Sequence, residues 1–469
     1  MAKIEPKLAA GFKDYSPREM IPRQRMLDSM KAVCELFGAL PLDTSIVERY
    51  EVLTQGEPTN KEIFRIASRK KKKPNTEEEL VNEDVDDQSG LALRFDLTVS
   101  LARFLAANPD VQKPFKRYQT GYVFRGENPQ AGRFRGFTQF DLDTVGSSDP
   151  MSDAEIVAWM NTSMEKLGVP KFIIRVNSRK ILNGLAEYAG FDASKISDVL
   201  RIIDKLDKQG WDVVRNELMS TEKKDETSEP GPGLSLSQAE LIKKFIDLRG
   251  DSPRQVLDRV SSLMSDSKMA QEGVAELAAI AECIEALGVP GERWTIDLSI
   301  ARGLDYYTGA IFETNVIGME KFGSVLSGGR YDNLVARLGG PDMPAVGASV
   351  GVDRLFELLK ELGLIQFEET VAQVAILNFE PSARIMVQQV ASALRGAGIN
   401  TELYMGKEET LKAQLSNVVS RNFRAIAIIG SRELERGVVA LKDSVSRTQI
   451  EVPMAEVPDA VRNILGSAT

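Results

Sequence analysis

Residues 116–146 read KRYQTGYVFRGENPQAGRFRGFTQFDLDTVG, and this stretch predicts two strands joined by a loop rich in Gly, Asn, Pro and Gln. Successive side chains of a strand point to opposite faces. One face of the first strand then carries Arg117, Gln119, Gly121, Val123 and Arg125, and one face of the second carries Arg133, Arg135, Phe137, Gln139, Asp141 and Asp143. We therefore expect Arg125, Gln139 and Asp143 to line a common cleft that takes a polyanion and a polar small molecule. Periodicity alone equally fits a solvent-facing hairpin of alternating charge.

Three further segments put arginine, glycine and tyrosine where apolar strands would be expected. They are SIARGLDYYTGAIF at 299–312, SVLSGGRYDNLVARL at 324–338 and AVGASVGVDRL at 345–355. With the hairpin, they resemble the motifs of histidyl-tRNA synthetases, which are class II aminoacyl-tRNA synthetases. The hairpin resembles class II motif 2, ARGLDYYTG and SGGRYDNLV resemble the two histidine-specific signatures, and GVDRL resembles motif 3. Four long motifs in the family's order are far more specific than a lone glycine pattern.

Length and composition limit the number of domains, the partners and the compartment that can be expected. The chain has 469 residues, of which 43% are hydrophobic and 27% charged, so it is long enough for two or three domains with cores. Its net charge of −9 means that a nucleic acid must be met by local basic patches. The two cysteines, Cys34 and Cys283, form no CxxC, which favours a reducing cytosol and predicts no zinc site. The sequence shows no signal peptide and no membrane-spanning run, so we expect a cytoplasmic protein.

The chain contains no histidine. Ser–His–Asp relays, Cys–His pairs and imidazole metal ligands are therefore excluded within it. Any chemistry must use arginine, carboxylate, tyrosine and backbone groups, or groups that the substrates bring.

The resemblance implies an α+β fold: a class II synthetase antiparallel sheet flanked by helices, with a helical insertion domain and a C-terminal α/β anticodon-binding domain. We expect catalytic core in residues 1–170, with motifs 1 and 2, and in residues 291–366, with the histidine signatures and motif 3. Residues 171–290 would form the insertion, which in the family lies against the tRNA acceptor arm, and residues 370–469 the anticodon-binding domain. In that domain the tRNA-contacting candidates are Lys407, Lys412, Arg421 and Arg424, and for each a solvated helix face is the alternative.

Local signals predict several elements. SPRE at 16–19 is a capping box that opens a long amphipathic helix, and SDAE at 152–155 opens another with the same capping chemistry. Residues 38–48 should form the motif 1 strand, a dimer-interface element in the family, with Ser45 where the family has proline. RKKKK at 69–73 and the acidic stretch after it predict a charged insertion, either a solvated loop or a tRNA-contacting arm.

Amino-acid activation sets the chemistry that such a site must supply. The substrate carboxylate attacks the α-phosphate of ATP already ionised, so charge neutralisation and alignment are needed and a protein base is not. Arginine grips phosphate oxygens bidentately and keeps its charge. The resemblance implies that Arg125 holds the α-phosphate, Arg354 the γ-phosphate, and Arg302 the reacting α-phosphate and carboxylate of ATP and histidine. ATP would enter as its Mg²⁺ complex, and surface ion pairing is the alternative role for each arginine.

Two groups of residues are expected to hold the amino acid. In LRFDLT at 93–98, Asp96 and Thr98 should share one strand face, and a carboxylate with a hydroxyl suits an α-ammonium group. The matching family positions act with Gln139, whereas the alternative is that Asp96 caps a helix beginning near Thr98. By the resemblance, Asp143 and Tyr307 are the partners of the imidazole ring, which needs an acceptor for its N–H.

Other residues extend the expected histidine and tRNA contacts. Tyr306 adjoins Tyr307 in the sequence and is expected to pack or hydrogen-bond beside the histidine. The motif 2 loop meets the tRNA acceptor end in the family. Gln130 there matches a position used for the extra 5′ nucleotide, and Asn128 stands where some relatives have arginine.

The resulting hypothesis is a homodimeric histidine–tRNA ligase that makes histidyl-adenylate from histidine and ATP and transfers histidine to tRNA(His). One alternative is the non-catalytic regulatory paralogue that partners ATP phosphoribosyltransferase, which typically lacks the anticodon-binding domain. Intact ARGLDYYTG and the domain after Leu364 argue against it. The other alternative, a class II synthetase for another amino acid, would need different residues at Asp143 and Tyr307.

Overall fold

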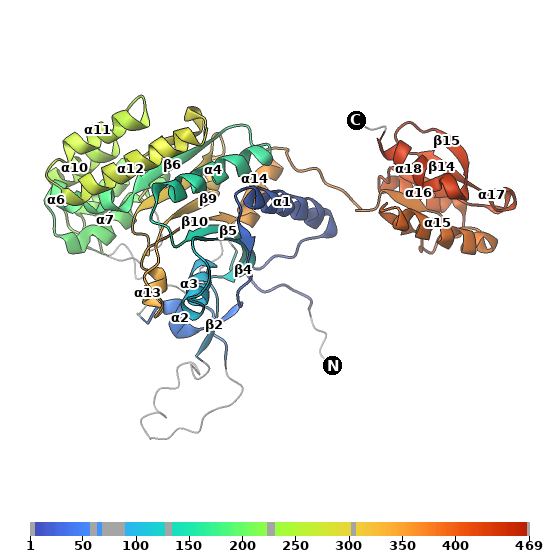
Figure 1. The fold of residues 1–469 in the computed structure, drawn as a ribbon, viewed down its shortest axis with the longest axis horizontal. Helices are drawn as coiled ribbons and strands as arrows, with labels where there is room; N and C mark the ends of the chain where they lie inside the picture. The colour runs from blue at the N-terminus through green and yellow to red at the C-terminus, as the bar shows by residue number, and fades with distance from the viewer. Residues whose placement is uncertain are drawn as a thin grey trace, which may run out of the picture. The chain divides into compact units, whose positions relative to one another are not determined.

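The structure is a computed structural model that describes residues 5–56, 63–67, 90–126, 134–222, 230–301 and 306–466. It divides into two compact units (Figure 1). One comprises Met1–Lys13 with Met26–Leu364, and the other comprises Asp14–Arg25 with Ile365–Thr469. The expected charged insertion at 69–87 and the candidates Arg302, Asn128, Gln130 and Arg133 lie outside the described residues.

The larger unit is built on an eight-stranded sheet with the order β1-β4-β5-β10-β9-β8-β6-β7. Its strands are β1 Leu40–Pro41, β4 Phe115–Phe124, β5 Gly136–Val145, β6 Phe172–Ser178, β7 Trp294–Ile296, β8 Ala310–Val316, β9 Leu326–Arg330 and β10 Ala345–Gly351. The pairs at the two ends, β1 with β4 and β6 with β7, are parallel, and the pairs between them are antiparallel. The expected antiparallel class II core is confirmed.

Helices flank this sheet: α1 Pro17–Leu36, α2 Tyr50–Thr54, α3 Thr98–Ala107, α4 Pro150–Lys166, α13 Leu334–Arg337 and α14 Val352–Glu361. α4 packs against β5, β6, β8, β9 and β10. Phe140 of β5 stacks on Trp159 of α4, with ring centroids 6.5 Å apart. Since strand side chains alternate, Asp141 and Asp143 point to the other face. The face of β5 that carries Phe140 is therefore buried under α4, and the carboxylates of the strand lie on the opposite, polar face of the sheet.

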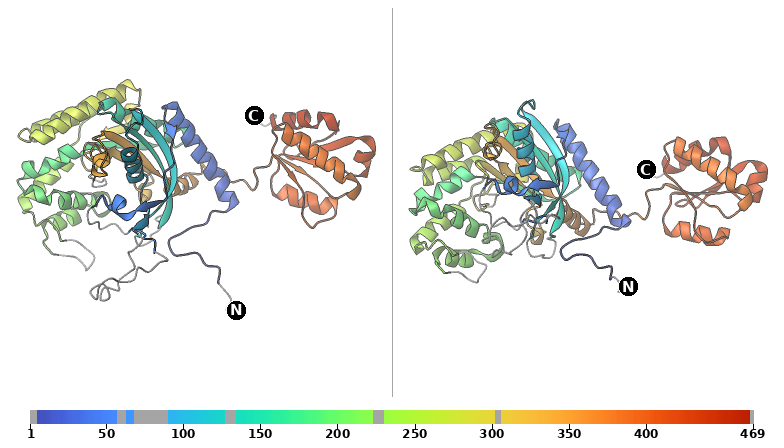
Figure 2. Two further views of the ribbon diagram at one scale, coloured as in Figure 1. Left: turned by 60° about the horizontal axis from the view of Figure 1, so that its bottom comes forward. Right: turned by 90° about the horizontal axis from the view of Figure 1, so that it is seen from below.

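The helical insertion lies between β6 and β7 in the sequence. Its helices are α5 Arg179–Asn183, α6 Leu185–Ala189, α7 Ile196–Ile203, α8 Leu206–Gln209, α9 Trp211–Met219, α10 Leu236–Ile246, α11 Pro253–Leu263 and α12 Lys268–Ala286. β6 falls inside the expected 171–290 range but joins the main sheet, so the helical part begins at Arg179. In both views of Figure 2 these green and yellow helices gather at one end of the sheet, where α12 packs against α4 and α5.

The C-terminal unit contains a five-stranded sheet with the order β12-β11-β13-β14-β15. The strands are β11 Val374–Ile376, β12 Thr401–Leu403, β13 Ala425–Ile428, β14 Val438–Asp443 and β15 Gln449–Pro453, and the helices are α15 Arg384–Gly396, α16 Leu411–Ser420, α17 Ser431–Arg436 and α18 Val457–Gly466. Aliphatic side chains of β11 and β13 pack with those of α15 and α18 in one core. The expected small α/β domain is confirmed.

The N-terminal helix forms as the capping box predicts. The backbone N–H and the hydroxyl of Ser16 each donate to the Glu19 carboxylate at 3.1 Å. Further along α1, Met26, Met30 and Cys34 are buried on one face, which is the face that helical periodicity selects.

The expected start of the second capped helix is wrong by three residues, because the N-cap is Asp149 and not Ser152. Asp149 accepts a hydrogen bond from Met151 N at 2.9 Å, and Pro150 occupies the first turn of α4. Asp153 is instead buried and pairs with Arg330 of β9. A buried carboxylate needs such a partner, so Asp153 stabilises the packing of α4 on the sheet.

The motif 1 strand expected at 38–48 is interrupted. β1 ends at Pro41, and β2 Val47–Arg49 pairs with β3 Leu91–Leu93 in a separate two-stranded sheet. Between them, Thr44 O accepts from Arg94 Nη1 at 2.7 Å, and Ser45 Oγ donates to Val47 O at 2.7 Å. Thr44 O thus bonds a side chain rather than a neighbouring strand at the break between β1 and β2.

Candidate active site

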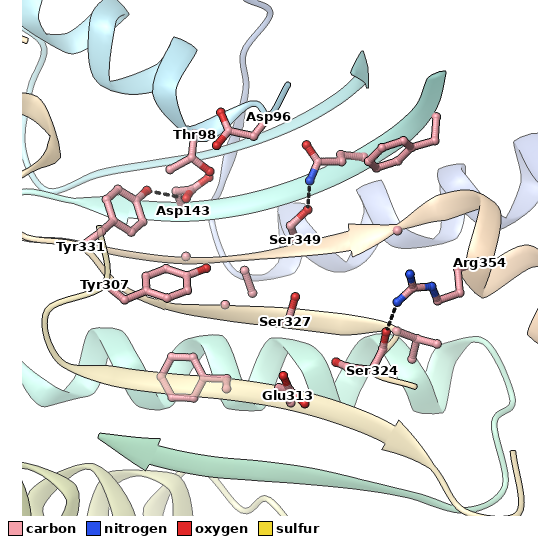
Figure 3. A pocket seen from close by; sticks show the side chains of 18 of the residues that line it. Asp96, Thr98, Asp143, Tyr307, Glu313, Ser324, Ser327, Tyr331, Ser349 and Arg354 are labelled. Carbon is pink, nitrogen blue, oxygen red and sulfur yellow. Dashed lines mark hydrogen bonds between the residues drawn. The ribbon is translucent and has the colours of Figure 1, made fainter. Parts of the chain in front are cut away.

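A cavity of about 370 Å³ opens on the polar face of the main sheet (Figure 3). It is bordered by residues of β5, β8, β9 and β10 and of the first turns of α3 and α14. Every candidate for ATP or histidine binding that the structure describes lines it, namely Asp96, Thr98, Arg125, Gln139, Asp143, Tyr306, Tyr307 and Arg354. The expected common cleft is therefore confirmed for the hairpin residues and extends to the other motifs.

The strand register brings these polar groups together. In the β4–β5 pair Arg117 lies opposite Asp143, and Gly121 lies opposite Gln139. On the other side of β5, Gly347 of β10 lies opposite Asp143. A Cβ at Gly347 would lie 2.0 Å from Asp143 Oδ1, so glycine is needed there to leave room for the carboxylate.

The expectation that Asp96 and Thr98 share a strand face is wrong. β3 ends at Leu93, and Thr98 begins α3. Asp96 Oδ1 accepts a hydrogen bond from Val99 N at 3.0 Å, so Asp96 does cap the helix, while Oδ2 accepts from the Tyr306 hydroxyl at 3.4 Å. The same carboxylate therefore caps α3 and faces the cavity.

Gln139 of β5 has one of its two polar atoms engaged. Its Nε2 donates to Ser349 Oγ at 2.9 Å. Its Oε1 is buried and accepts no hydrogen bond from any described residue. A buried acceptor without a donor is costly unless a ligand satisfies it, and this oxygen suits an ammonium group.

Asp143 lies at the deep end of the cavity in a buried ion pair. Its Oδ2 is 2.8 Å from Nη2 of Arg117, whose side chain is 0% exposed. Its Oδ1 accepts a hydrogen bond from the Tyr331 hydroxyl. Tyr331 was not among the expected site residues. It stands in the signature SGGRYDNLV, but the sequence alone did not show that its ring turns back onto β5.

Burial controls the protonation of this end of the cavity. Burial, reinforced by the nearby Asp143 carboxylate, raises the pKa of Asp141 to about 7, against the opposing effect of Arg117. Burial, with the Asp143 charge beside them, also raises the pKa of Tyr307 and of Tyr331. Both tyrosines therefore keep their hydroxyl protons at neutral pH and act as hydrogen-bond donors.

The raised pKa of Asp141 predicts a pH-dependent gain in stability for Asp141→Asn. The folded-state pKa lies above the ordinary value of 3.8, so the contribution of Asp141 to stability falls as the pH rises from about 4 to about 7. We expect Asp141→Asn to raise Tm at pH 8 by about 2–4 °C for each kcal/mol gained, and by less at pH 5.5. Calorimetry at both pH values, with the exposed Glu187→Gln as control, measures this; a larger gain at pH 5.5 would contradict it.

The arginines occupy a different part of the cavity. Figure 3 shows Arg354 at the end away from Asp143 and Tyr331. Its Nη1 donates to Ser324 O at 2.9 Å. Arg125 donates from Nε to Phe95 O at 3.3 Å, and its guanidinium lies 5.1 Å from the centroid of the Phe137 ring. The cavity thus has a carboxylate and tyrosine end, and guanidinium groups for a polyanion elsewhere.

Sequence reasoning missed one polar row of the cavity floor. Ser349, Ser327 and Glu313 lie opposite one another on β10, β9 and β8 and line the cavity. Each of the three strands carries one of these polar residues directly after an apolar one, and this is the only sign of them in the sequence. Only the pairing of β10, β9 and β8 shows that the three residues lie side by side.

A mostly antiparallel sheet whose cavity has a carboxylate and tyrosine end and an arginine-bearing part fits the catalytic core of a class II aminoacyl-tRNA synthetase. The family model for histidyl-tRNA synthetase matches residues 11–355, and that for the anticodon binding domain matches residues 373–464. The histidine–tRNA ligase of Wolinella succinogenes is 39% identical, over 94% of this chain and 94% of that protein. The crystal structure of histidyl-tRNA synthetase from Nostoc sp. PCC 7120 has a TM-score of 0.81 and 33% identity, covering 98% of this chain and 100% of that one. The chain belongs to the histidyl-tRNA synthetase family.

A further solved structure bears on the regulatory alternative. It is described as an ATP phosphoribosyltransferase regulatory subunit/histidyl-tRNA synthetase from Bacillus halodurans C, with a TM-score of 0.69 and 21% identity over 91% of this chain. At this identity the likeness shows a shared fold. The relatives named histidine–tRNA ligase and the match to an anticodon binding domain leave the regulatory alternative less supported.

Among the described residues, no helix is both long and apolar enough to span a bilayer.

Proposed function

We propose that this protein is a histidine–tRNA ligase that activates histidine with ATP and transfers it to tRNA(His). The observation that carries the proposal is the single cavity in which all eight described candidates meet. Its deep end offers a carboxylate with protonated tyrosines, and its other part offers guanidinium groups. That division matches a polar amino acid and a nucleotide polyphosphate.

The amino-acid end has groups for both ends of histidine. Asp143 accepts a hydrogen bond from one imidazole N–H, and Tyr307 donates to the other ring nitrogen. Asp96, Thr98 and Gln139 bind the α-ammonium group, for which the unsatisfied Gln139 Oε1 is available. Tyr306 holds Asp96 in place through its hydroxyl.

ATP enters as its Mg²⁺ complex, so the metal belongs to the substrate. Arg125 binds the α-phosphate, Arg354 the γ-phosphate, and Arg302 neutralises the charge that builds when the histidine carboxylate attacks the α-phosphate. The nucleophile is already ionised. No group of the chain therefore needs to remove a proton, which agrees with the lack of histidine.

The test is ATP–pyrophosphate exchange with each of the twenty amino acids in turn. We expect exchange with histidine alone, because only an imidazole offers two ring nitrogens to Asp143 and Tyr307. Exchange with a different amino acid would support the second class II alternative. No exchange with any amino acid would support the regulatory alternative.

Transfer to tRNA involves other surfaces. We place Gln130 and Asn128 of the motif 2 loop at the acceptor end of tRNA(His), with Gln130 at its extra 5′ nucleotide and Asn128 as a weak phosphate contact. The C-terminal unit reads the anticodon. There Arg421 pairs with Glu402 and Arg424 with Asp443, so Lys407 and Lys412 are the stronger phosphate-contact candidates among the four.

We infer a homodimer from apolar side chains around motif 1. The exposed ones are Leu36, Leu40, Ile46, Val47 and Leu91. β1 is an edge strand, paired only with β4 among the described strands. An open edge beside exposed apolar groups is a common interface signal.

The protein acts in the cytoplasm, where its tRNA is, and its two free cysteines suit a reducing compartment.

Ile46→Glu is expected to weaken the dimer. It puts a charge among these apolar groups, which would be desolvated at the interface, so association should weaken by about tenfold or more. Light scattering after size-exclusion chromatography over a concentration series measures this. The control is Ile317→Glu, at a residue 55% exposed just beyond β8. A variant as dimeric as the wild type would place the interface elsewhere.

A further inference from the structure

Arg175 lies outside the cavity but in line with its floor. On β6 it lies opposite Glu313 of β8, which in turn lies opposite Ser327 of β9. Opposite residues of neighbouring strands share a face. The Arg175 side chain therefore emerges on the polar face of the sheet, one strand beyond the residues that line the cavity.

The Arg175 guanidinium uses all three of its nitrogens. Nε donates to Asp297 Oδ2 at 2.8 Å, and Nη2 donates to Ser299 Oγ at 2.7 Å. Nη1 donates to Asp207 Oδ2 at 2.7 Å. Asp207 belongs to α8 of the insertion, whereas Asp297 and Ser299 follow β7. One side chain thus joins the sheet, the insertion and the segment after β7.

That segment, Asp297–Ile300, is tied to β6 at several points. Asp297 N donates to Val176 O at 3.0 Å. Asp297 Oδ1 accepts from the backbone N–H and the hydroxyl of Ser299, at 3.0 and 2.7 Å. Asn177 Nδ2 donates to Ile300 O at 2.9 Å. The segment leads directly into ARGLDYYTG, and Arg302 follows Ile300 by two residues in the sequence.

The two carboxylate partners of Arg175 differ in their surroundings. The side chain of Asp297 is 17% exposed, and that of Asp207 is 61% exposed. Against the opposing effect of burial, Arg175 and Ser299 hold the pKa of Asp297 below its usual value. Exposed ion pairs contribute little to stability, whereas charge-assisted hydrogen bonds hold a shielded carboxylate firmly in place. The geometry therefore makes the contact with Asp297 the stronger of the two.

We propose that Arg175 is a positioning residue for activation, because its guanidinium fixes Asp297 and Ser299 and thereby the start of the first histidine signature. Its contact with Asp207 attaches the insertion to the same point and is not required for activation. The inference rests on the proposed function, since positioning is meaningful only if this signature takes part in adenylate formation. Displacing a catalytic segment by about 1 Å can lower a rate by about a hundredfold.

The test compares one variant on each side of the same guanidinium. Asp297→Asn and Asp207→Asn each remove one charge and keep the side-chain size. In the full-length protein, histidine-dependent pyrophosphate exchange gives kcat and the KM for ATP and for histidine, and calorimetry gives Tm. We expect Asp297→Asn to lower kcat by about ten- to a hundredfold with the KM for ATP within about twofold, and Asp207→Asn to stay within about twofold of wild type.

Conservative replacement of Arg175 separates positioning from bulk stability. Arg175→Lys keeps one charged donor and should retain more kcat than Arg175→Met at a similar Tm. Unchanged kcat in Asp297→Asn, or an equal loss in Asp207→Asn, would overturn the inference. A wild-type protein that exchanges no pyrophosphate with histidine would refute the proposed function instead, so the two failures are distinguishable.

Discussion

Arg302→Ala is expected to lower histidine-dependent pyrophosphate exchange by about a hundred- to a thousandfold. In the proposed mechanism its positive charge lies where negative charge accumulates, as the histidine carboxylate and the α-phosphate approach each other. Histidine binding should change much less, because we propose that Asp143, Asp96 and Gln139 hold the imidazole and the ammonium group. The measurements are kcat by exchange and the Kd of histidine by calorimetry.

A matched control comes from the exposed arginine Arg337 of α13, which contacts Gln55. Arg337→Ala removes the same kind of charge outside the cavity and should leave exchange unchanged. If Arg302→Ala keeps activity within a few-fold of wild type, the role assigned to Arg302 is wrong. If it loses histidine binding in proportion to rate, Arg302 binds the ground state rather than the transition state.

The hairpin was predictable because its information is local. A period of two placed Arg125, Gln139 and Asp143 on one side, and all three line the cavity, Gln139 and Asp143 from β5 and Arg125 from the residue after β4. The start of α1 followed from its capping box, whereas that of α4 did not. The N-cap of α4 lies three residues before the expected one, because Asp149 suits the N-cap and Pro150 suits the first turn.

Other features depend on contacts between distant segments. Asp96 could have been a strand residue or a helix cap. The bond that it accepts from a backbone N–H of α3 shows that it caps this helix, and its contact with the distant Tyr306 and its place in the lining show that it also faces the cavity. Arg117 reaches Asp143 from β4 through the hairpin register, whereas Tyr331 reaches it from the residue after β9. The pairings of β9 with β10 and of β10 with β5 bring Tyr331 there, and no local pattern specifies them.

The buried pair of Arg117 and Asp143 changes which substitution tests the imidazole contact. Asp143→Ala would leave the Arg117 guanidinium, which is 0% exposed, without its counter-ion. Removing one partner of a buried pair costs about 3–5 kcal/mol, so a loss of activity would be confused with misfolding. Asp143→Asn also removes the counter-ion, but it fills the same space and keeps an acceptor oxygen beside Arg117, which retains Gln119 Oε1 at 3.2 Å and Leu97 O at 3.3 Å, so it disturbs the fold less than alanine.

Asp143→Asn should therefore lower kcat/KM for histidine by about ten- to a hundredfold, because a hydrogen bond to a charged acceptor becomes one to a neutral amide. The KM for ATP should stay within about twofold, since Arg354 lies at the other end of the cavity. Tyr331→Phe is the control: it removes the donor to Asp143 Oδ1 but keeps the carboxylate charge, so its loss should be smaller. Exchange kinetics with each substrate varied in turn, together with Tm, measure both variants. An equal loss for histidine and ATP would mean that Asp143 supports the fold rather than the choice of amino acid.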